Sequence, residues 1–88
     1  MTSLTLNVEP IAQSVETSDS ELVVGLIDGR VLSAPLVWFP RLHDATPVNR
    51  MVYELMGNGV GIHWPELDED ISVVGLLAGR HSVEYRAK

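Results

Sequence analysis

The sequence predicts an α+β fold in which a small antiparallel sheet, made of two hairpins and an N-terminal strand, carries one or two short helices on one face. Two pairs of β-rich runs flank turn-forming residues at 28–29 and 57–59, and two other stretches combine helical spacing with helix end signals. The chain has 88 residues, fewer than the roughly 100–200 of a typical domain. We therefore expect one domain over residues 1–88, with its core at about residues 10–81.

The N-terminal half of the chain predicts a three-stranded meander. Residues 21–27 and 30–36 are rich in Val, Leu and Ile, and Asp28-Gly29 lies between them. This dipeptide is typical of a type I′ turn, because both of its residues tolerate the positive φ that the turn requires. Residues 11–16 alternate apolar and polar side chains, so we expect them to pair with the hairpin as a further strand.

One short helix and a second helix start signal are predicted after this meander. Apolar side chains recur at spacings of three and four, at Leu36, Val37, Phe39 and Leu42. A proline is tolerated in the first turn of a helix, so Pro40 is compatible with a helix that begins near residues 38–39. Thr46-Pro47 is a second start signal, a hydroxyl N-cap followed by a proline at the first helical position, but residues 48–51 after it make at most one or two turns.

The C-terminal half predicts a second hairpin and a final helix. Residues 52–56 and 60–64 are the hairpin strands, and Gly57-Asn58-Gly59 is their loop. Ser72 has the position of an N-cap for the final helix, with Ile71 and Leu76 as a hydrophobic staple around it. Gly79 stands where a left-handed residue would end this helix.

Two stretches of the chain resemble an uncharacterised family of small bacterial proteins. The first is Gly61-Ile62-His63-Trp64-Pro65-x-Leu67-Asp68-Glu69-Asp70-Ile71-Ser72-x-x-Gly75-Leu76-Leu77. The second is Asp28-Gly29-Arg30 followed by Pro35-Leu36-x-Trp38-Phe39-Pro40-Arg41-Leu42-x-x-Ala45-Thr46-Pro47. The resemblance implies a compact α+β domain, regarded as a candidate antitoxin of a toxin–antitoxin pair and often encoded beside a second small protein. It implies no catalytic residues.

Charge and composition narrow the classes of partner. The net charge is -6, which disfavours direct nucleic acid binding and favours a small basic protein. The chain has no cysteine, so we expect neither disulfides nor a thiolate metal site. The N-terminus lacks a secretory signal pattern, and no apolar run approaches the roughly 20 residues of a membrane span, so we expect a cytoplasmic protein without a membrane segment.

Four carboxylates within five residues form the main candidate site, at Glu66, Asp68, Glu69 and Asp70. Carboxylates attract a basic partner and can be recognised by Arg, so we predict that these residues bind a partner together with His63 and Trp64. Three alternatives remain. The carboxylates could instead complement the positive N-terminus of the final helix. His63 and Trp64 could have structural roles in the core. His63 with Asp68 or Asp70 could also hold a metal, although the spacing departs from a calcium loop.

The sequence thus predicts a non-enzymatic, antitoxin-like module that neutralises or docks a small basic protein encoded nearby. It contains no Gly-rich phosphate loop and no G-x-S-x-G elbow, and we expect no cofactor. The alternative function is a self-associating structural domain, because a small open sheet has unpaired edges that could join two copies in a homo-oligomer.

Overall fold

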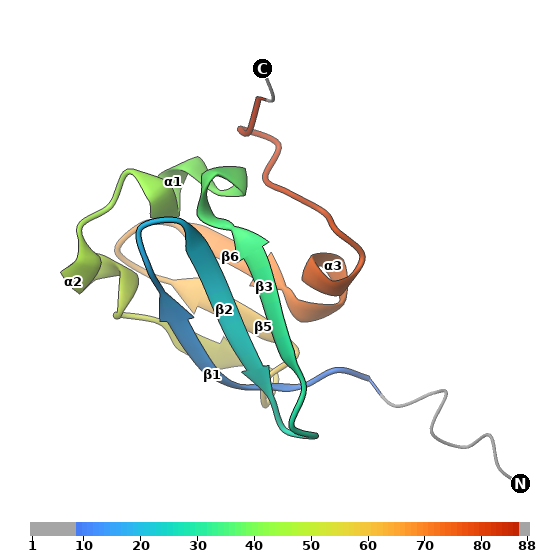
Figure 1. Cartoon of the computed structure of the whole chain (residues 1–88). Helices are drawn as coiled ribbons and strands as arrows, with labels where there is room; N and C mark the ends of the chain where they lie inside the picture. Colours follow the sequence, from blue (N-terminus) through green and yellow to red (C-terminus); the bar gives the residue numbers. More distant parts are fainter. Residues whose placement is uncertain (1–8, 87–88) are drawn as a thin grey trace, which may run out of the picture.

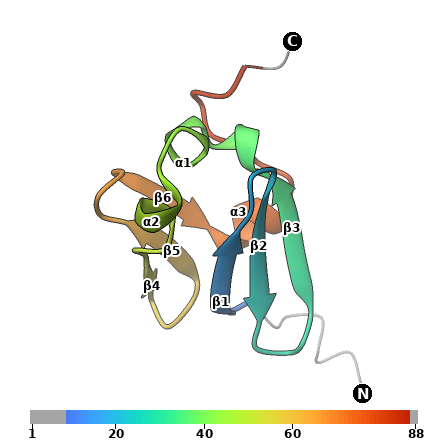
Figure 2. The same cartoon turned by 60° about the vertical axis from the view of Figure 1, so that its left-hand side comes forward.

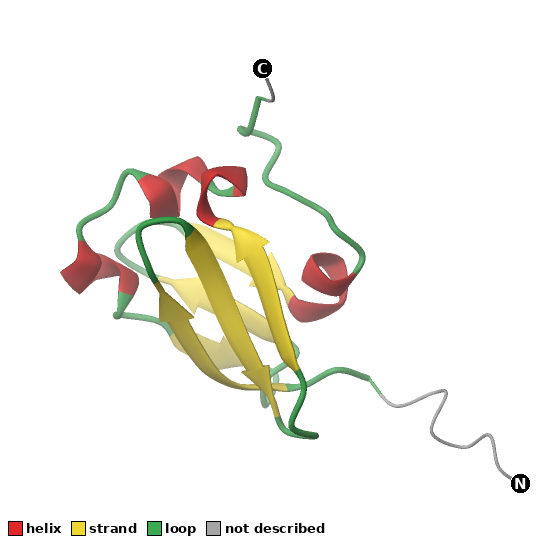
Figure 3. Ribbon diagram, viewed as in Figure 1, coloured by secondary structure: helices red, strands yellow, loops and turns green. Residues whose placement is uncertain are grey.

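The computed structural model describes residues 9–86 and contains two antiparallel sheets of three strands each (Figure 1). The first sheet has the order β1 (Ala12–Thr17), β2 (Glu21–Leu26) and β3 (Val31–Pro35), and the second has the order β4 (Glu54–Met56), β5 (Gly61–Trp64) and β6 (Glu69–Ser72). Figure 3 shows the first sheet in front of the second, with the helices at their ends and sides. The predicted α+β fold class is confirmed.

The strands divide between two sheets, whereas the sequence predicts one. The reason is the long connection between β3 and β4, which contains η2 (Leu36–Trp38, a 3-10 turn), α1 (Pro40–His43) and α2 (Pro47–Arg50). Figure 2 shows that this connection crosses from one sheet to the other at one end of the molecule, so β4 does not continue beside β3. None of the helices in residues 9–86 has the length and apolar character needed to cross a membrane.

The first hairpin forms as predicted, but its turn is not type I′. Gly29 has a φ of 96°, whereas Asp28 is not among the residues with positive φ. The N–H of Gly29 donates to Leu26 O at 3.0 Å, and the N–H of Leu26 donates to Arg30 O at 2.8 Å, so the loop has three residues. The Asp28 carboxylate accepts a hydrogen bond from the N–H of Arg30 at 3.0 Å, and this side-chain contact favours the longer turn.

The second hairpin is confirmed, and it is extended by a strand that the sequence analysis does not predict. Residues 69–72 form β6, which pairs with β5 in the register Trp64↔Glu69 and His63↔Asp70. Burial alternates along β6, with Glu69 and Ile71 buried and the other two residues exposed. Because a glutamate occupies one of the two inward positions, the alternation of apolar and polar residues that indicates a strand is hidden in the sequence.

The final helix, α3 (Val73–Leu77), begins and ends as predicted. Ser72 Oγ accepts a hydrogen bond from the N–H of Gly75 at 3.1 Å, as an N-cap does. Gly79 has a φ of 82°. Its N–H donates to Leu76 O at 3.0 Å and the N–H of Arg80 donates to Gly75 O at 2.9 Å, which together form a Schellman motif. The same agreement holds for α2, where Thr46 Oγ1 accepts from the N–H of Asn49 at 3.2 Å.

The apolar core lies between the two sheets and under the connecting helices (Figure 2). Its largest fully buried side chains come from both sheets, η2, α1 and α3: Trp64, Leu22, Leu26, Leu36, Leu42, Ile62, Val24 and Val73. The described chain also makes contacts beyond residue 81, the expected end of the core. The N–H of Ser82 donates to Trp38 O at 3.0 Å, and Glu84 binds Arg41. Residues 1–8 and 87–88 lie outside the described part.

Candidate functional site

The acidic segment 66–70 forms a turn and the first half of β6 rather than a helix end. The N-cap of α3 is Ser72, and no acidic residue lies in the first turn of this helix. The alternative in which the carboxylates complement the N-terminus of the last helix is therefore wrong. The physical reason is the pairing of β6 with β5, which separates the carboxylates from the helix by a strand.

Asp68 lies in the turn before β6, and its side chain is largely exposed. The residue has a φ of 53°, a conformation that Asp adopts more readily than most residues. Arg41 Nη1 donates to Asp68 O at 2.9 Å and lies 3.3 Å from Asp68 Oδ2, but the side chain of Asp68 remains 91% exposed. An ion pair this exposed contributes little to stability, so the carboxylate stays accessible to another molecule.

Arg41 has a second and closer acidic partner. Its Nε lies 3.0 Å from Glu84 Oε1 and its Nη2 lies 3.1 Å from Glu84 Oε2, a bidentate arrangement. The hydrogen bonds and the charge of Glu84 raise the pKa of Arg41. Arg41 is thus held mainly by Glu84, and the exposed carboxylates of the segment receive little neutralisation from it.

Asp70 and His63 are brought together on the outer face of the second sheet. They are paired residues on β6 and β5, and Asp70 Oδ1 is hydrogen bonded to His63 Nδ1. The side chain of Asp70 is nevertheless 70% exposed. Glu54 of β4 is paired with His63 from the side opposite β6. A second carboxylate therefore lies next to His63 in the row of cross-strand neighbours that runs from Glu54 through His63 to Asp70.

Glu66 is exposed, and among residues 9–86 its carboxylate takes part in no hydrogen bond or ion pair. We refer to the exposed carboxylates of Glu66, Asp68 and Asp70 as the acidic surface. From Met51 to Gly79 the sequence contains five acidic residues and no Lys or Arg. The stretch of chain that contains the acidic surface therefore has an excess of negative charge and no Lys or Arg to balance it.

Glu69 and Trp64 occupy inward positions, opposite each other on β6 and β5. Trp64 is 0% exposed and its Nε1 donates to Arg50 O at 3.0 Å, whereas Glu69 is 8% exposed. Burial raises the pKa of Glu69 above its ordinary value, and the charge of Arg41 opposes this effect. Both side chains are buried, and Trp64 is part of the apolar core, which corrects their assignment to a partner-binding surface and confirms the structural alternative for Trp64.

The structure separates the residues of the metal alternative. His63 contacts Asp70, but Asp68 is directed to Arg41. Across residues 9–86, no three side chains of His, Asp or Glu converge in a way that could hold a metal ion. A single His and carboxylate pair, exposed to solvent, offers two ligands only, fewer than the usual three or four protein ligands of a zinc site.

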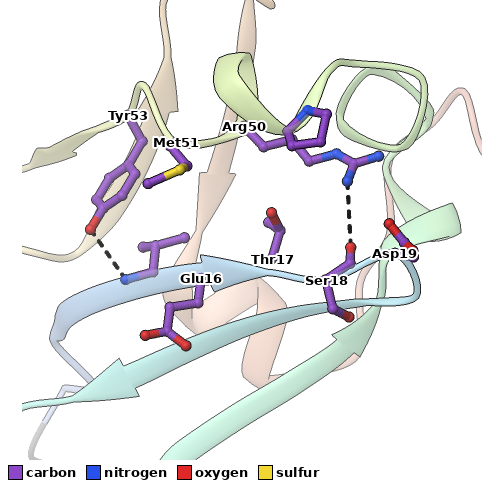
Figure 4. A pocket seen from close by; sticks show the side chains of 9 residues that line it. Glu16, Thr17, Ser18, Asp19, Arg50, Met51 and Tyr53 are labelled. Carbon is purple, nitrogen blue, oxygen red and sulfur yellow. Dashed lines mark hydrogen bonds between the residues drawn. The ribbon is translucent and has the colours of Figure 1, made fainter.

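A groove of about 610 Å³ opens between β1 and the segment 47–53 (Figure 4), and no residue of the acidic surface lines it. Its lining residues are Val15, Glu16, Thr17, Ser18, Asp19, Pro47, Arg50, Met51 and Tyr53. The hydroxyl of Tyr53 accepts a hydrogen bond from the N–H of Val15 at 3.3 Å. The sequence analysis does not predict this groove, because its two walls lie some 30 residues apart and no local pattern indicates that they meet.

Arg50 is a buried cation at the wall of this groove, with 9% of its surface exposed. It donates from Nε to Leu42 O at 2.8 Å and from Nη2 to His43 O at 2.9 Å, and its Nη1 lies 3.5 Å from Ser18 O. The first two carbonyls lie at the C-terminal end of α1, where the last carbonyls of a helix are available to accept from a side-chain donor. The fold itself thus compensates the charge of Arg50.

Comparison with known proteins agrees with this architecture. A protein of unknown function from Rhodospirillum rubrum has a similar structure, with a TM-score of 0.75 and 29% sequence identity over 88% of this chain and 95% of that chain. An uncharacterized protein from Chromobacterium violaceum, solved by NMR, has a TM-score of 0.70 and 28% identity over 84% of this chain and 70% of that chain. No curated protein matches.

The sequence also matches a family profile. Residues 12–82 match the family described as "Protein of unknown function (DUF2442)", which is most of the chain and includes both sheets and all the helices. This protein therefore belongs to the DUF2442 family.

Proposed function

We propose that this protein is a cytoplasmic, non-enzymatic, antitoxin-like module that docks a small basic protein through its acidic surface. The observation that carries the proposal is that the carboxylates of Glu66, Asp68 and Asp70 are exposed, while the fold uses them little. His63 lies beside them as a half-buried hydrogen-bonding group. The resemblance to a family with candidate antitoxins supports a partner encoded by the adjacent gene.

The charge distribution supports a basic partner rather than a neutral one. Exposed carboxylates accelerate association with a basic surface, and they can accept bidentate hydrogen bonds from Arg. The ion pair between Asp68 and Arg41 and the contact between Asp70 and His63 are both exposed, so a partner can replace them at little cost in free energy.

The test is a binding measurement with the product of the adjacent gene. The two proteins are co-expressed, purified and titrated by calorimetry at low and moderate salt. The variant carries Glu66→Gln, Asp68→Asn and Asp70→Asn together. If each carboxylate contributes about 0.2–1 kcal/mol, the affinity falls by roughly threefold to a hundredfold, and its dependence on salt becomes weaker.

A matched control separates this surface from the total charge. Glu9→Gln, Glu21→Gln and Asp44→Asn remove the same three charges from exposed positions elsewhere on the molecule. The control is expected to bind almost as tightly as the unmodified protein. Equal affinity of the acidic-surface variant and the control would show that Glu66, Asp68 and Asp70 do not form the docking site.

The alternative function is a self-associating domain, and the surroundings of β4 favour it. β4 is an edge strand whose three residues are all exposed. Exposed apolar side chains lie on it and just before it, at Val48, Met51, Val52, Leu55 and Met56. Sedimentation of the isolated protein distinguishes the two functions. A tight homodimer that Leu55→Asp dissociates and that ignores the product of the adjacent gene would support self-association.

A further inference from the structure

β1 has a free edge over part of its length. It pairs with β2 on one side, and no strand of the described chain pairs with its other side. The N–H of Ser18 donates to Glu21 O across the β1–β2 turn, whereas the N–H of Val15 points the other way, to Tyr53. Since backbone groups alternate along a strand, the N–H and C=O of Thr17 also point away from β2, into the groove.

The groove runs along this free edge, as Figure 4 shows. Its volume of about 610 Å³ falls within the roughly 300–1,000 Å³ of pockets that hold ligands. Met51, which is 77% exposed, and Tyr53 form the wall opposite β1. An extended chain placed there would find backbone groups on one side and apolar surface on the other.

The charges around the edge are negative. Glu16 and Asp19 are exposed, and no Lys or Arg within the described residues forms an ion pair with them. From Glu9 to Gly29 the sequence contains five acidic residues and no basic one. The cation that lines the groove, Arg50, is occupied by backbone carbonyls and is almost entirely buried.

We propose that the free edge of β1 binds an extended segment of another protein, in which basic and apolar residues alternate. The segment adds a strand to the first sheet through the backbone of Thr17, a mode known as β-augmentation. This surface is distinct from the acidic surface, and the inference does not depend on the proposed function.

The alternation follows from the side chains on the two faces of β1. In Figure 4 the Glu16 carboxylate projects to the face away from Met51, while Thr17 projects toward the groove. On an added strand, the residue opposite Glu16 shares its face, and an opposite charge is favoured there. The residues on either side of it project into the groove, beside Val15 and Met51, where apolar side chains are favoured.

The required pattern also argues against a second copy of this chain as the occupant. None of its six described strands contains a Lys or an Arg. A strand from another copy would therefore bring no cation to Glu16, and it would come from a molecule with a net charge of -6. Charge complementarity thus selects a basic segment of a different protein.

The test uses a synthetic six-residue peptide of alternating Lys and Val, with blocked ends, added to the full-length ¹⁵N-labelled protein. We expect the backbone amide signals of Thr17 and its neighbours to shift in a saturable manner. We also expect hydrogen exchange of the Thr17 amide to be fast without the peptide and slower with it. Peptides of alternating Glu and Val, or of alternating Lys and Gly, are expected to bind at least about tenfold more weakly, because they lack the charge or the apolar contacts.

Two pairs of variants test the mechanism. Thr17→Pro removes the edge N–H without breaking the β1–β2 ladder and is expected to weaken peptide binding by about tenfold, whereas Thr17→Val keeps the N–H and binds normally. Glu16→Lys is expected to weaken binding by at least about threefold more than Glu21→Lys. Glu21 is exposed and lies on β2, a strand paired on both sides, so that substitution makes the same change in charge away from the free edge.

Several outcomes would overturn the proposal. These are signal changes that map to the acidic surface instead, no saturable change up to millimolar peptide, or unaltered binding by Thr17→Pro. Protection of the Thr17 amide without peptide would show that the edge is already covered. Protection that rises with protein concentration would identify a second copy as the occupant, and protection independent of concentration would identify another part of this chain.

Discussion

The buried guanidinium of Arg50 connects three segments of the chain, so a substitution of Arg50 tests how these segments are held together. It donates to the last carbonyls of α1 and approaches Ser18 in the β1–β2 turn, while its own carbonyl accepts from Trp64. Arg50→Met keeps a long apolar side chain and that carbonyl, but it removes every side-chain donor. The carbonyls of Leu42 and His43 then lose a charged partner.

The magnitude can be estimated from the two short bonds, at 2.8 and 2.9 Å. A hydrogen bond from a charged donor contributes about 1.5–3 kcal/mol, so the gross loss is about 3–6 kcal/mol. The variant no longer buries a charge and gains apolar contact, which offsets part of the loss. We therefore expect the free energy of unfolding to fall by about 2–3 kcal/mol, which in a domain of this size lowers the Tm by roughly 8–24 °C.

The assay is thermal and urea unfolding followed by circular dichroism. Arg30→Met is the matched control, because Arg30 is 56% exposed in its side chain and its exposed ion pair with Asp28 contributes little to stability. The Tm of Arg50→Lys should lie between those of Arg50→Met and Arg30→Met, since an ammonium group cannot reproduce the donor geometry of a guanidinium. If Arg50→Met unfolds within about 2 °C of Arg30→Met, the hydrogen bonds of Arg50 do not stabilise the fold and the reasoning is refuted.

Two further predictions concern Glu69 and Gly59. Because the pKa of Glu69 is raised in the folded state, its ionisation destabilises the protein as the pH rises through that pKa. Glu69→Gln should therefore have a higher Tm than the unmodified protein at pH 7, and this difference in Tm should narrow toward pH 4. A difference in Tm that does not change with pH would contradict a raised pKa of Glu69. In Gly59→Ala, the new Cβ, at a residue with a φ of 111°, would overlap the carbonyl oxygen of Ala12 where β1 meets the second sheet. Urea unfolding should therefore show that the free energy of unfolding falls by about 2 kcal/mol or more. Gly29→Ala isolates the cost of positive φ, because its Cβ would meet no atom within 4 Å, and an equal loss in both variants would exclude the overlap as a cause.

Much of the local structure was predictable because it depends on short-range chemistry. The hydroxyls of Thr46 and Ser72 cap their helices through N–H groups three residues away, and Gly79 adopts the left-handed conformation at the end of α3. The two hairpins were predictable for the same reason, since their turn residues and flanking strands are adjacent in sequence. The prediction of a type I′ turn at Asp28-Gly29 was wrong, and the cause was also local. The Asp28 side chain accepts a hydrogen bond from the N–H of Arg30, a contact that the turn preference of the Asp-Gly dipeptide does not take into account.

The candidate site was predictable only as a set of acidic residues. Nothing adjacent to Glu69 in the sequence distinguishes it from Asp68 or Asp70, yet one of the three is buried and the other two are exposed. The difference arises from the pairing of β6 with β5, because alternate residues of a strand face opposite sides of the sheet. A shift of the register by one residue would bury Asp70 and expose Glu69.

Residue types and their spacing are therefore sufficient for the fold class, the caps, the hairpins and the excess of negative charge, since each depends on groups that are neighbours along the chain. The division into two sheets, the burial of Glu69 and Trp64, and the groove beside β1 depend on segments that are far apart in sequence. Tyr53 reaches Val15 across 38 residues, and Arg50 approaches Ser18 across 32. Such contacts form only when the whole chain packs around one core, which is why the accessible carboxylates and the free strand edge could be identified only in the folded protein.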